Sequence, residues 1–178
     1  MTRSSPSAFL FLALLAACHR TAQVGSPATP PARATVRAPS GALMGVLGLV
    51  QTENGVHITG TLHALAPGAH GIHLHGVGSC GAADFTSAGP HFNPGAAHHG
   101  LENPEGPHAG DLPNITASSS GDATVDLTTP RVTLDAASPT GVFDVDGTAI
   151  VVHAGPDDQH SDPAGNSGAR VACGVLTR

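Results

Sequence analysis

The sequence predicts an all-β domain, an antiparallel sandwich or barrel of about eight short strands with two long loops. The composition supports this fold class, because Gly and Pro are abundant, with 23 and 15 residues, and only 3% of the chain is aromatic. Short apolar runs separated by turn residues recur along the chain, and no segment has the pattern of a long helix. A length of 178 residues allows one domain of ordinary size with appendages.

The expected strands alternate with turns from residue 34 to the end of the chain. The second and third are joined by Glu53-Asn54-Gly55, an Asn-Gly signal typical of a β-hairpin. Two polar stretches, 78–112 and 154–168, have no strand pattern, and loops of such length in a compact domain are normally functional. The strands are expected at residues 34–37, 41–51, 56–65, 71–77, 113–118, 123–128, 148–153 and 169–176.

The start of the chain predicts a signal peptide. Arg3 gives a positive beginning, and the apolar run 8–17 is too short to cross a bilayer as a helix. The run ends in Leu15-Ala16-Ala17-Cys18, which resembles the lipobox of bacterial lipoproteins, in which the cysteine is lipid-modified and becomes the first residue. A plain secretory signal with an incidental cysteine is the alternative.

The sequence therefore divides into three parts. Residues 1–17 are the expected lipoprotein signal peptide, and residues 18–31 hold the lipidated Cys18 and a flexible linker. Residues 32–178 form the expected domain. We expect an exported protein that the lipid on Cys18 anchors to a membrane of the cell envelope, facing the periplasm or the cell surface.

The domain is acidic and holds one cysteine pair. From Ala32 onward there are five arginines against thirteen acidic residues, a net charge of −8 before metals, which argues against a nucleic-acid partner. The chain has three cysteines, and an odd number normally indicates a stray thiol. If Cys18 carries lipid, Cys80 and Cys173 remain as one pair for an oxidising compartment.

Histidines in one expected strand and in the first long loop point to metal binding. His73 and His75 flank Leu74, so both rings emerge on the same face of the strand, close enough to chelate one ion. His153 ends another expected strand and is a candidate to join them. The loop supplies three histidines and a carboxylate among glycines and prolines, which meets the needs of a tetrahedral zinc site: His91, His99, His108 and Asp111.

These residues lie in blocks that resemble copper/zinc superoxide dismutase in order and approximate spacing, over essentially all of 32–177. The resemblance implies an eight-stranded antiparallel Greek-key β-barrel or sandwich, immunoglobulin-like in architecture, with two long functional loops. The blocks are Gly71-Ile72-His73-Leu74-His75, Ser87-Ala88-Gly89-Pro90-His91-Phe92-Asn93-Pro94, His99-Gly100, His108-Ala109-Gly110-Asp111, Val151-Val152-His153 and Gly168-Ala169-Arg170-Val171-Ala172-Cys173-Gly174.

The resemblance implies two metal ions joined by one imidazole. Copper would be bound by His73, His75, His91 and His153. Zinc would be bound by His91, His99, His108 and Asp111. The ring of His91 belongs to both sets, because a deprotonated imidazole has two nitrogens and can bridge two cations.

Other positions take roles only through the resemblance. Arg170 matches the arginine that guides the anion to copper, and Cys80 and Cys173 match a disulfide within the subunit. Asp157 matches a carboxylate that links His73 to His99, and the adjacent Asp158 is the alternative. Six histidines outside both metal sets are interpreted as surface residues, with metal capture as an alternative for the last two of them: His19, His57, His63, His70, His98 and His160.

The implied function is dismutation of superoxide to dioxygen and hydrogen peroxide by alternation of copper between Cu(II) and Cu(I). Zinc would be the structural and electrostatic partner, and His91 would carry a proton. The alternative is an envelope protein that binds copper and zinc without dismutase activity, and the complete ligand set together with Arg170 favours the enzyme. The expected partners are superoxide and, through Cys18, a membrane, and the oligomeric state stays open.

Overall fold

The structure, a computed structural model, describes residues 1, 29, 31–81 and 83–178. The expected signal peptide, Cys18 and almost all of the expected linker lie outside the described residues, so the division of the chain before residue 32 stays a prediction. Within the described part, no helix has the length and apolar character needed to cross a membrane.

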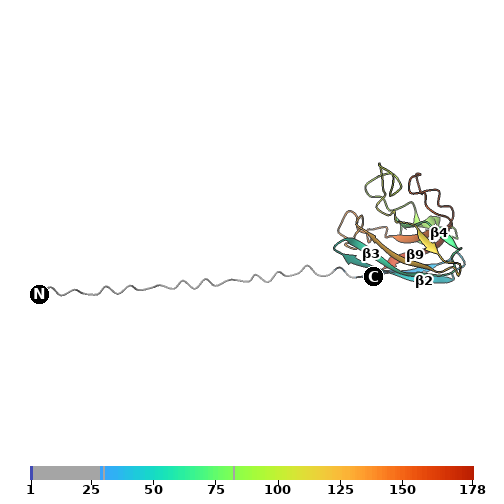
Figure 1. Cartoon of the computed structure of the whole chain (residues 1–178), viewed down its shortest axis with the longest axis horizontal. Coiled ribbons are helices and arrows are strands. Elements are labelled where there is room, and N and C mark those ends of the chain that lie inside the picture. The colour runs from blue at the N-terminus through green and yellow to red at the C-terminus, as the bar shows by residue number, and fades with distance from the viewer. Residues whose placement is uncertain (2–28, 30, 82) are drawn as a thin grey trace.

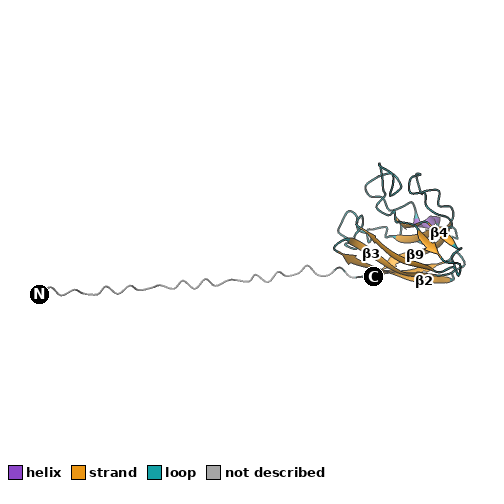
Figure 2. Cartoon of the chain, viewed as in Figure 1, coloured by secondary structure: helices purple, strands orange, loops and turns teal. Residues whose placement is uncertain are grey.

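The described chain is all-β, which confirms the expected fold class (Figure 2). Apart from one 3-10 turn, η1 (Thr86–Ala88), the described elements are nine strands. These are β1 (Ala32–Arg37), β2 (Leu43–Thr52), β3 (Gly55–Leu62), β4 (Gly68–His70), β5 (Ile72–His75), β6 (Ile115–Ala117), β7 (Ala123–Thr129), β8 (Ala149–His153) and β9 (Arg170–Thr177).

The ninth strand arises because the chain changes sheets at Gly71. The expected strand over 71–77 corresponds to β5, which pairs with β8 in the large sheet, whereas β4, which was not expected, precedes it and pairs with β6 in a small sheet. Between them, Gly71 N–H donates to the Gly155 carbonyl, and the Gly71 carbonyl accepts from His153 N–H, both at 2.8 Å. A side chain at this crossing would press on Ser167 and His73, at 3.0 and 3.2 Å, so glycine suits the switch.

The large sheet is antiparallel and has the order β5-β8-β9-β1-β2-β3-β7. The apolar side chains that alternate along β1, β2 and β3 point into its curled interior, where Leu47, Leu49 and Ile58 are fully buried. Burying each such side chain contributes about 1.5–3 kcal/mol. The sheet therefore closes around one apolar core and needs no helix to cover it.

Strands β5 and β8 differ from the others because both of their faces are buried. Ile72 and Leu74 of β5 pack into the apolar core, whereas His73 and His75 alternate to the opposite face. The two long loops cover that second face, rising on the side of the domain away from β2 (Figure 1). The fold thus buries histidines without placing them in the apolar core.

The first long loop is tied to β9 by a disulfide between Cys80 and Cys173, which confirms the expected pairing. The two cysteines are separated by 93 residues. In the chain-entropy model, closing a span of this length stabilises the folded state by about 4–5 kcal/mol. Phe85 and Ala88 pack beside the bond in a small apolar cluster of their own.

Candidate metal centre

Four imidazoles converge beside β5. His73 and His75 come from β5, His91 comes from the first long loop, and His153 ends β8. Each offers a nitrogen, and these four nitrogens all lie within 4.8 Å of one another. We call these residues the four-histidine cluster, and each of them is buried, with at most 5% of its surface exposed.

The hydrogen bonds of this cluster leave one nitrogen of every ring without a protein partner, and that nitrogen is available to bind a metal. The Nδ1 atoms of His75 and His153 face the carbonyl oxygens of Gly89 and Gly168, at 2.8 and 3.2 Å. A carbonyl only accepts, so these Nδ1 atoms carry the hydrogen and each neutral ring keeps a lone pair on Nε2.

The nitrogens that converge are the unpartnered ones. His73 Nδ1 and the Nε2 atoms of His75, His91 and His153 are buried and have no hydrogen-bond partner. Leaving a buried polar atom unpaired costs about 1–3 kcal/mol, so four in one place call for a common partner. A copper ion fits this donor set, because imidazole nitrogen suits copper.

A second cluster shares His91 and has a different composition. Its donors are Nδ1 of His91, His99 and His108, together with Oδ1 of Asp111, and we call it the mixed cluster. Asp111 Oδ1 lies 2.9, 3.0 and 3.3 Å from those three nitrogens in that order, and the Nδ1 atoms of His91 and His108 are 3.4 Å apart. Four ligands around a tetrahedral zinc ion, with bonds of about 2.0 Å, are separated by about 3.3 Å. The mixed cluster therefore fits zinc, and the ring of His91 faces both sites.

Backbone pairing with β5 brings the loop ligands to the strand ligands. Phe92 N–H donates to the Leu74 carbonyl at 2.8 Å, and Leu74 N–H donates to the Gly110 carbonyl at 2.9 Å. Isolated bridges then set His91 beside His75 and Asp111 beside His73. A Cβ atom on Gly110 would lie 2.2 Å from the Leu74 carbonyl oxygen, so only glycine permits this approach.

Hydrogen bonds hold both the carboxylate and the backbone of Asp111. Oδ2 accepts the backbone N–H groups of Gly100 and His108, each at 2.9 Å, which leaves Oδ1 facing the mixed cluster. The guanidinium of Arg131 donates to the Asp111 carbonyl at 2.5 Å. Burial opposes the charge of Asp111, but hydrogen bonds from His91 and His99 outweigh it and hold the pKa well below its usual range.

A buried carboxylate joins the two clusters, and the structure identifies it as Asp157. Oδ2 accepts from His73 Nε2 at 2.7 Å, and Oδ1 accepts from His99 Nε2 at 3.0 Å. Asp158, the alternative left open by the sequence, instead accepts the backbone N–H groups of His160 and Ser161. Carboxylates that hold the far nitrogen of a ligating histidine fix its tautomer and ring orientation.

The position of Asp157 is itself secured by neighbouring residues. Its backbone N–H and carbonyl form two 2.8 Å hydrogen bonds with the side-chain amide of Asn114. Gln159 N–H donates to Oδ1 at 2.7 Å. Gly165 covers the carboxylate closely, because a Cβ atom there would lie 1.7 Å from Oδ1.

Arg170 begins β9 beside the four-histidine cluster. Its two terminal nitrogens donate to the carbonyls of Phe85 and Gly89, at 2.7 and 2.8 Å. The Gly89 carbonyl also accepts from His75, so one backbone group fixes both the guanidinium and a ring of the cluster. Arg170 therefore presents a partly exposed positive charge in one orientation.

Comparisons with known proteins agree with this geometry. The model of the copper/zinc superoxide dismutase family (SODC) matches residues 43–176. Superoxide dismutase [Cu-Zn] 1 of Aquifex aeolicus (strain VF5) is 48% identical over 137 residues, which are 76% of this chain and 81% of the relative. The chain belongs to the copper/zinc superoxide dismutase family. As a member it is a superoxide dismutase enzyme with copper and zinc as cofactors, as expected from the sequence.

Solved structures show the same fold. A SOD-like protein from Bacillus subtilis is 37% identical, with a TM-score of 0.79 over 82% of this chain and 97% of that one. The Cu/Zn superoxide dismutase from Brucella abortus is 31% identical, with a TM-score of 0.66 over 82% of this chain and 99% of that one. Since proteins described only as SOD-like share the fold, the ligand sets of this chain carry the argument about its metals.

Burial keeps the four-histidine cluster neutral in the superoxide dismutase before metals bind. Burial is the main cause that lowers the ring pKa values, to about 2 for His75 and to about 4 for His91 and His153. Burial also opposes the charge on His99, but hydrogen bonds to Asp111 and Asp157 dominate and raise its pKa to about 9. The rings that face copper are therefore deprotonated, the form that binds metal, at neutral pH.

The sequence interpretation missed residues that support the ligands. We expected His70 on the surface, and this was wrong: it is 2% exposed, and its ring nitrogens lie 2.7 Å from the carbonyls of His153 and Ala66. Asn114 and Arg131 were not singled out, because a lone amide or arginine in a loop carries no spacing signal. Of the other expected surface histidines, His19 lies outside the described residues. His57, His63, His98 and His160 pair at the surface with acidic side chains.

Replacing Asp157 by Asn is expected to weaken zinc binding. Asn offers one acceptor oxygen where two ring N–H groups, from His73 and His99, require acceptors. We expect the zinc dissociation constant to rise about 10- to 100-fold, measured by competition with a chromophoric chelator. Asp158→Asn is the matched control, since its carboxylate contacts neither ring, and equal zinc affinity in the two variants would refute this role of Asp157.

The metal-free protein is expected to lose stability as pH falls from about 6 to about 5. In this range the unfolded chain takes up protons on histidine, whereas His75, His91 and His153 in the folded chain do not, because their pKa values are lowered. More protons bound in the unfolded state means that the free energy of unfolding decreases as pH falls. Urea denaturation after chelator treatment measures it, and a flat or opposite trend would contradict the buried neutral rings.

Proposed function

We propose that the chain dismutates superoxide at the cell envelope, held to a membrane by lipid on Cys18. The observation that carries the enzymatic part is the convergence of four unpartnered imidazole nitrogens within 4.8 Å, next to the fixed guanidinium of Arg170. A site built only to store metal has no use for an oriented cation beside the donor set. This arrangement favours the enzyme over a copper- and zinc-binding protein without activity.

The net reaction consumes two superoxide anions and two protons and yields one dioxygen and one hydrogen peroxide. Copper, when bound by the four-histidine cluster, supplies one-electron redox chemistry, whereas zinc has none to offer. His91 is the residue placed to handle a proton. Its Nδ1 belongs to the mixed cluster, and its Nε2 is free of protein partners, so Nε2 can hold a proton and return it to the departing product.

Arg170 is the residue placed to receive the substrate. Two backbone carbonyls hold its terminal nitrogens, and the other N–H groups of the guanidinium stay available to a small anion. The domain carries thirteen acidic residues and five arginines, so attraction over long distance is weak. Recruitment of superoxide then depends on the local charge of Arg170 and the metals.

Two observations support export and anchoring. The segment Leu15-Ala16-Ala17-Cys18 resembles a lipobox. The disulfide between Cys80 and Cys173 accounts for the other two cysteines and is typical of proteins in an oxidising compartment. A lipidated Cys18 leaves no unpaired thiol in the mature chain.

Replacing Arg170 by Ala is expected to lower dismutase activity by about 10-fold or more, because the local positive charge for the anion is lost. Arg170→Lys keeps the charge but cannot hold both carbonyls, so we expect intermediate activity. Activity is assayed on protein with measured copper and zinc. Arg33→Ala, which removes an exposed arginine of β1, is the control. Unmodified protein with full metal content and no dismutation would refute the proposed function.

Replacing Cys18 by Ser is expected to abolish acylation and to release the protein from the membrane fraction. Cells that express the full chain are labelled with an alkyne fatty acid and fractionated, and His19→Ala serves as the control next to the modified residue. The anchor would be refuted if the protein with its original sequence took up no label, or if Cys18→Ser kept the label. Either result would leave the enzymatic proposal intact.

A further inference from the structure

One side of the large sheet exposes apolar and basic side chains together. The outward residues of β1 are Arg33, Thr35 and Arg37, and those of β2 include Leu43, Val46 and Val50. We call these six residues the β1–β2 outer face. This face is the underside of the domain in Figure 1, below the label of β2, and the two long loops rise from the opposite side.

The apolar part of this face is unusual for the protein. Leu43, Val46 and Val50 are 59%, 49% and 51% exposed. They are the exposed large hydrophobic residues found within the described strands, and all three lie on β2. Single exposed hydrophobics are ordinary, but a group on one strand indicates a surface that contacts something.

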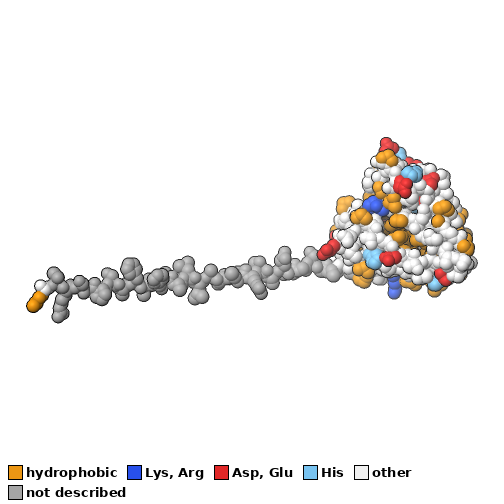
Figure 3. Space-filling view, viewed as in Figure 1, with side chains coloured by type: hydrophobic (Ala, Val, Ile, Leu, Met, Phe, Trp, Pro, Cys, Tyr) orange, Lys and Arg blue, Asp and Glu red, His pale blue; other side chains and the backbone are white. Residues whose placement is uncertain are grey.

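The strand register sets the two arginines among these apolar side chains. Arg37 pairs with Leu43, Thr35 pairs with Val46, and Arg33 pairs with Gly48, next to Val50 on the outer side of β2. Directly opposed residues on neighbouring strands are about 5 Å apart. Figure 3 shows a basic side chain projecting from this underside with hydrophobic side chains around it.

Acidic residues avoid the face although the domain is acidic. No residue of β1 or β2 is acidic, and no described acidic side chain forms an ion pair with Arg33 or Arg37. The adjoining strands β3 and β9 also contain no acidic residue; Glu53 lies in the β2–β3 turn, and Asp126 lies on β7, beyond β3, where it pairs with His57 at 2.7 Å. The face therefore carries local positive charge on a domain whose total charge is negative.

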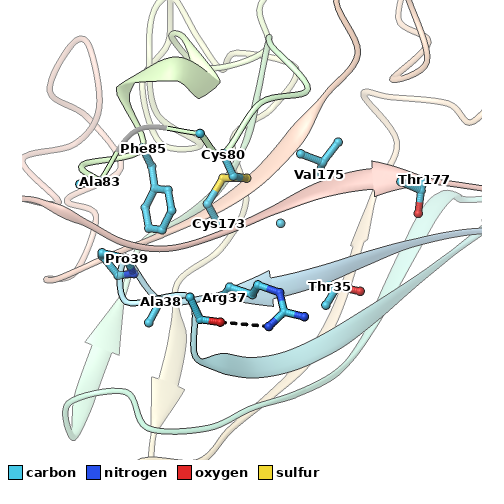
Figure 4. Close-up of a pocket in the computed structure, with 13 residues that line it drawn as sticks. Thr35, Arg37, Ala38, Pro39, Cys80, Ala83, Phe85, Cys173, Val175 and Thr177 are labelled. Atoms are coloured by element: carbon cyan, nitrogen blue, oxygen red, sulfur yellow. Dashed lines mark hydrogen bonds between the residues drawn. A yellow bond between two sulfur atoms is a disulfide. The ribbon is translucent and has the colours of Figure 1, made fainter.

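A groove of about 520 Å³ continues the face toward the disulfide. Figure 4 shows Phe85 and the Cys80–Cys173 bond on one side of this groove, with Arg37 and Thr35 on the other. Arg37 also donates to the Gly41 carbonyl at 3.0 Å, which holds its guanidinium along the rim. An apolar groove with a cation at its rim suits a lipid with an anionic headgroup.

We propose that the β1–β2 outer face docks on anionic phospholipid at the membrane that carries the anchor. The proposal rests on the proposed function only in that Cys18 supplies the tether. Ala32 begins β1 at 14 residues from Cys18, so the tether reaches at most about 50 Å. A tether of this length holds the face near the membrane at an effective concentration of about a millimolar. A dissociation constant of about a millimolar between the face and the lipid is then enough for the face to be docked half of the time.

Charge distinguishes a membrane from a second copy of the chain. If two copies met through this face, Arg33 and Arg37 of one copy would lie close to the same two arginines of the other and repel them. No acidic residue of β1 or β2 is present to offset this repulsion. Anionic headgroups instead neutralise both arginines. Docking in this way keeps the metal-binding loops on the side away from the lipid (Figure 1).

The chain offers a clean fluorescent test because it contains no Trp and no Tyr. Val50→Trp puts a single indole on the face. Val145→Trp is the matched control: Val145 is 99% exposed and adjoins Asp144, which lines a cavity with the metal ligands His91 and His108. The unacylated mature chain is coupled through the Cys18 thiol to a maleimide lipid, which replaces the anchor whether or not cells acylate this residue.

Quenching by brominated lipid reports contact. In vesicles with phosphatidylglycerol we expect brominated chains to quench the indole at position 50 at least roughly twofold more than that at position 145. The difference should shrink in phosphatidylcholine alone, and also with Arg33→Gln and Arg37→Gln, but not with Arg178→Gln, which makes the same charge change elsewhere. Equal quenching at the two positions would overturn the proposal, and so would quenching that the Arg33 and Arg37 variants leave unchanged. A dimer that forms through this face, detected by sedimentation, would also overturn it.

Discussion

The pairing of the first long loop with the edge of β5 is the contact on which the metal centre depends. Leu74 uses its N–H and carbonyl to hold the Gly110 and Phe92 segments of the loop. Because His73 and His75 flank Leu74 on the same strand, this pairing sets Asp111 and His91 beside them. Two metal sites that share one imidazole thus arise from ordinary backbone hydrogen bonds, with side-chain chemistry added at the neighbouring positions.

The second long loop makes this arrangement rigid from the other side. Its residue Asp157 accepts from His73 in one cluster and from His99 in the other. Four of the ligating rings, those of His73, His75, His99 and His153, have one nitrogen hydrogen-bonded to the protein and the other facing a metal cluster, so rotation of any of them breaks a hydrogen bond. Gly165 and Asn114 hold Asp157 in place, which makes the second loop a support for both sites although it supplies no ligand to either.

The sequence predicts the ligand positions better than their supports. The His-x-His pattern in a strand and the histidine-rich loop carry a spacing that follows from strand geometry and metal chemistry, and the structure brings those residues together. His70 gave no such signal, because it ends β4, a strand that the sequence did not predict and that precedes the change of sheets at Gly71. Asp157 and Asp158 are identical in type and adjacent, so only the fold of the loop decides which one reaches the rings.

In this domain the positions of the charged residues matter more than the net charge. Arg131 and Arg170 are held by backbone carbonyls of the metal-binding loop, Arg131 at Asp111 and Arg170 at Gly89, so each acts on atoms within a few ångströms. Arg33 and Arg37 lie on the opposite side of the sheet and face outward. In salt solution a charge acts over about 10 Å, so the acidic total does not cancel these local fields. A strongly acidic protein can therefore attract an anion at its metal centre and present a basic face elsewhere, provided that the sheet keeps the two apart.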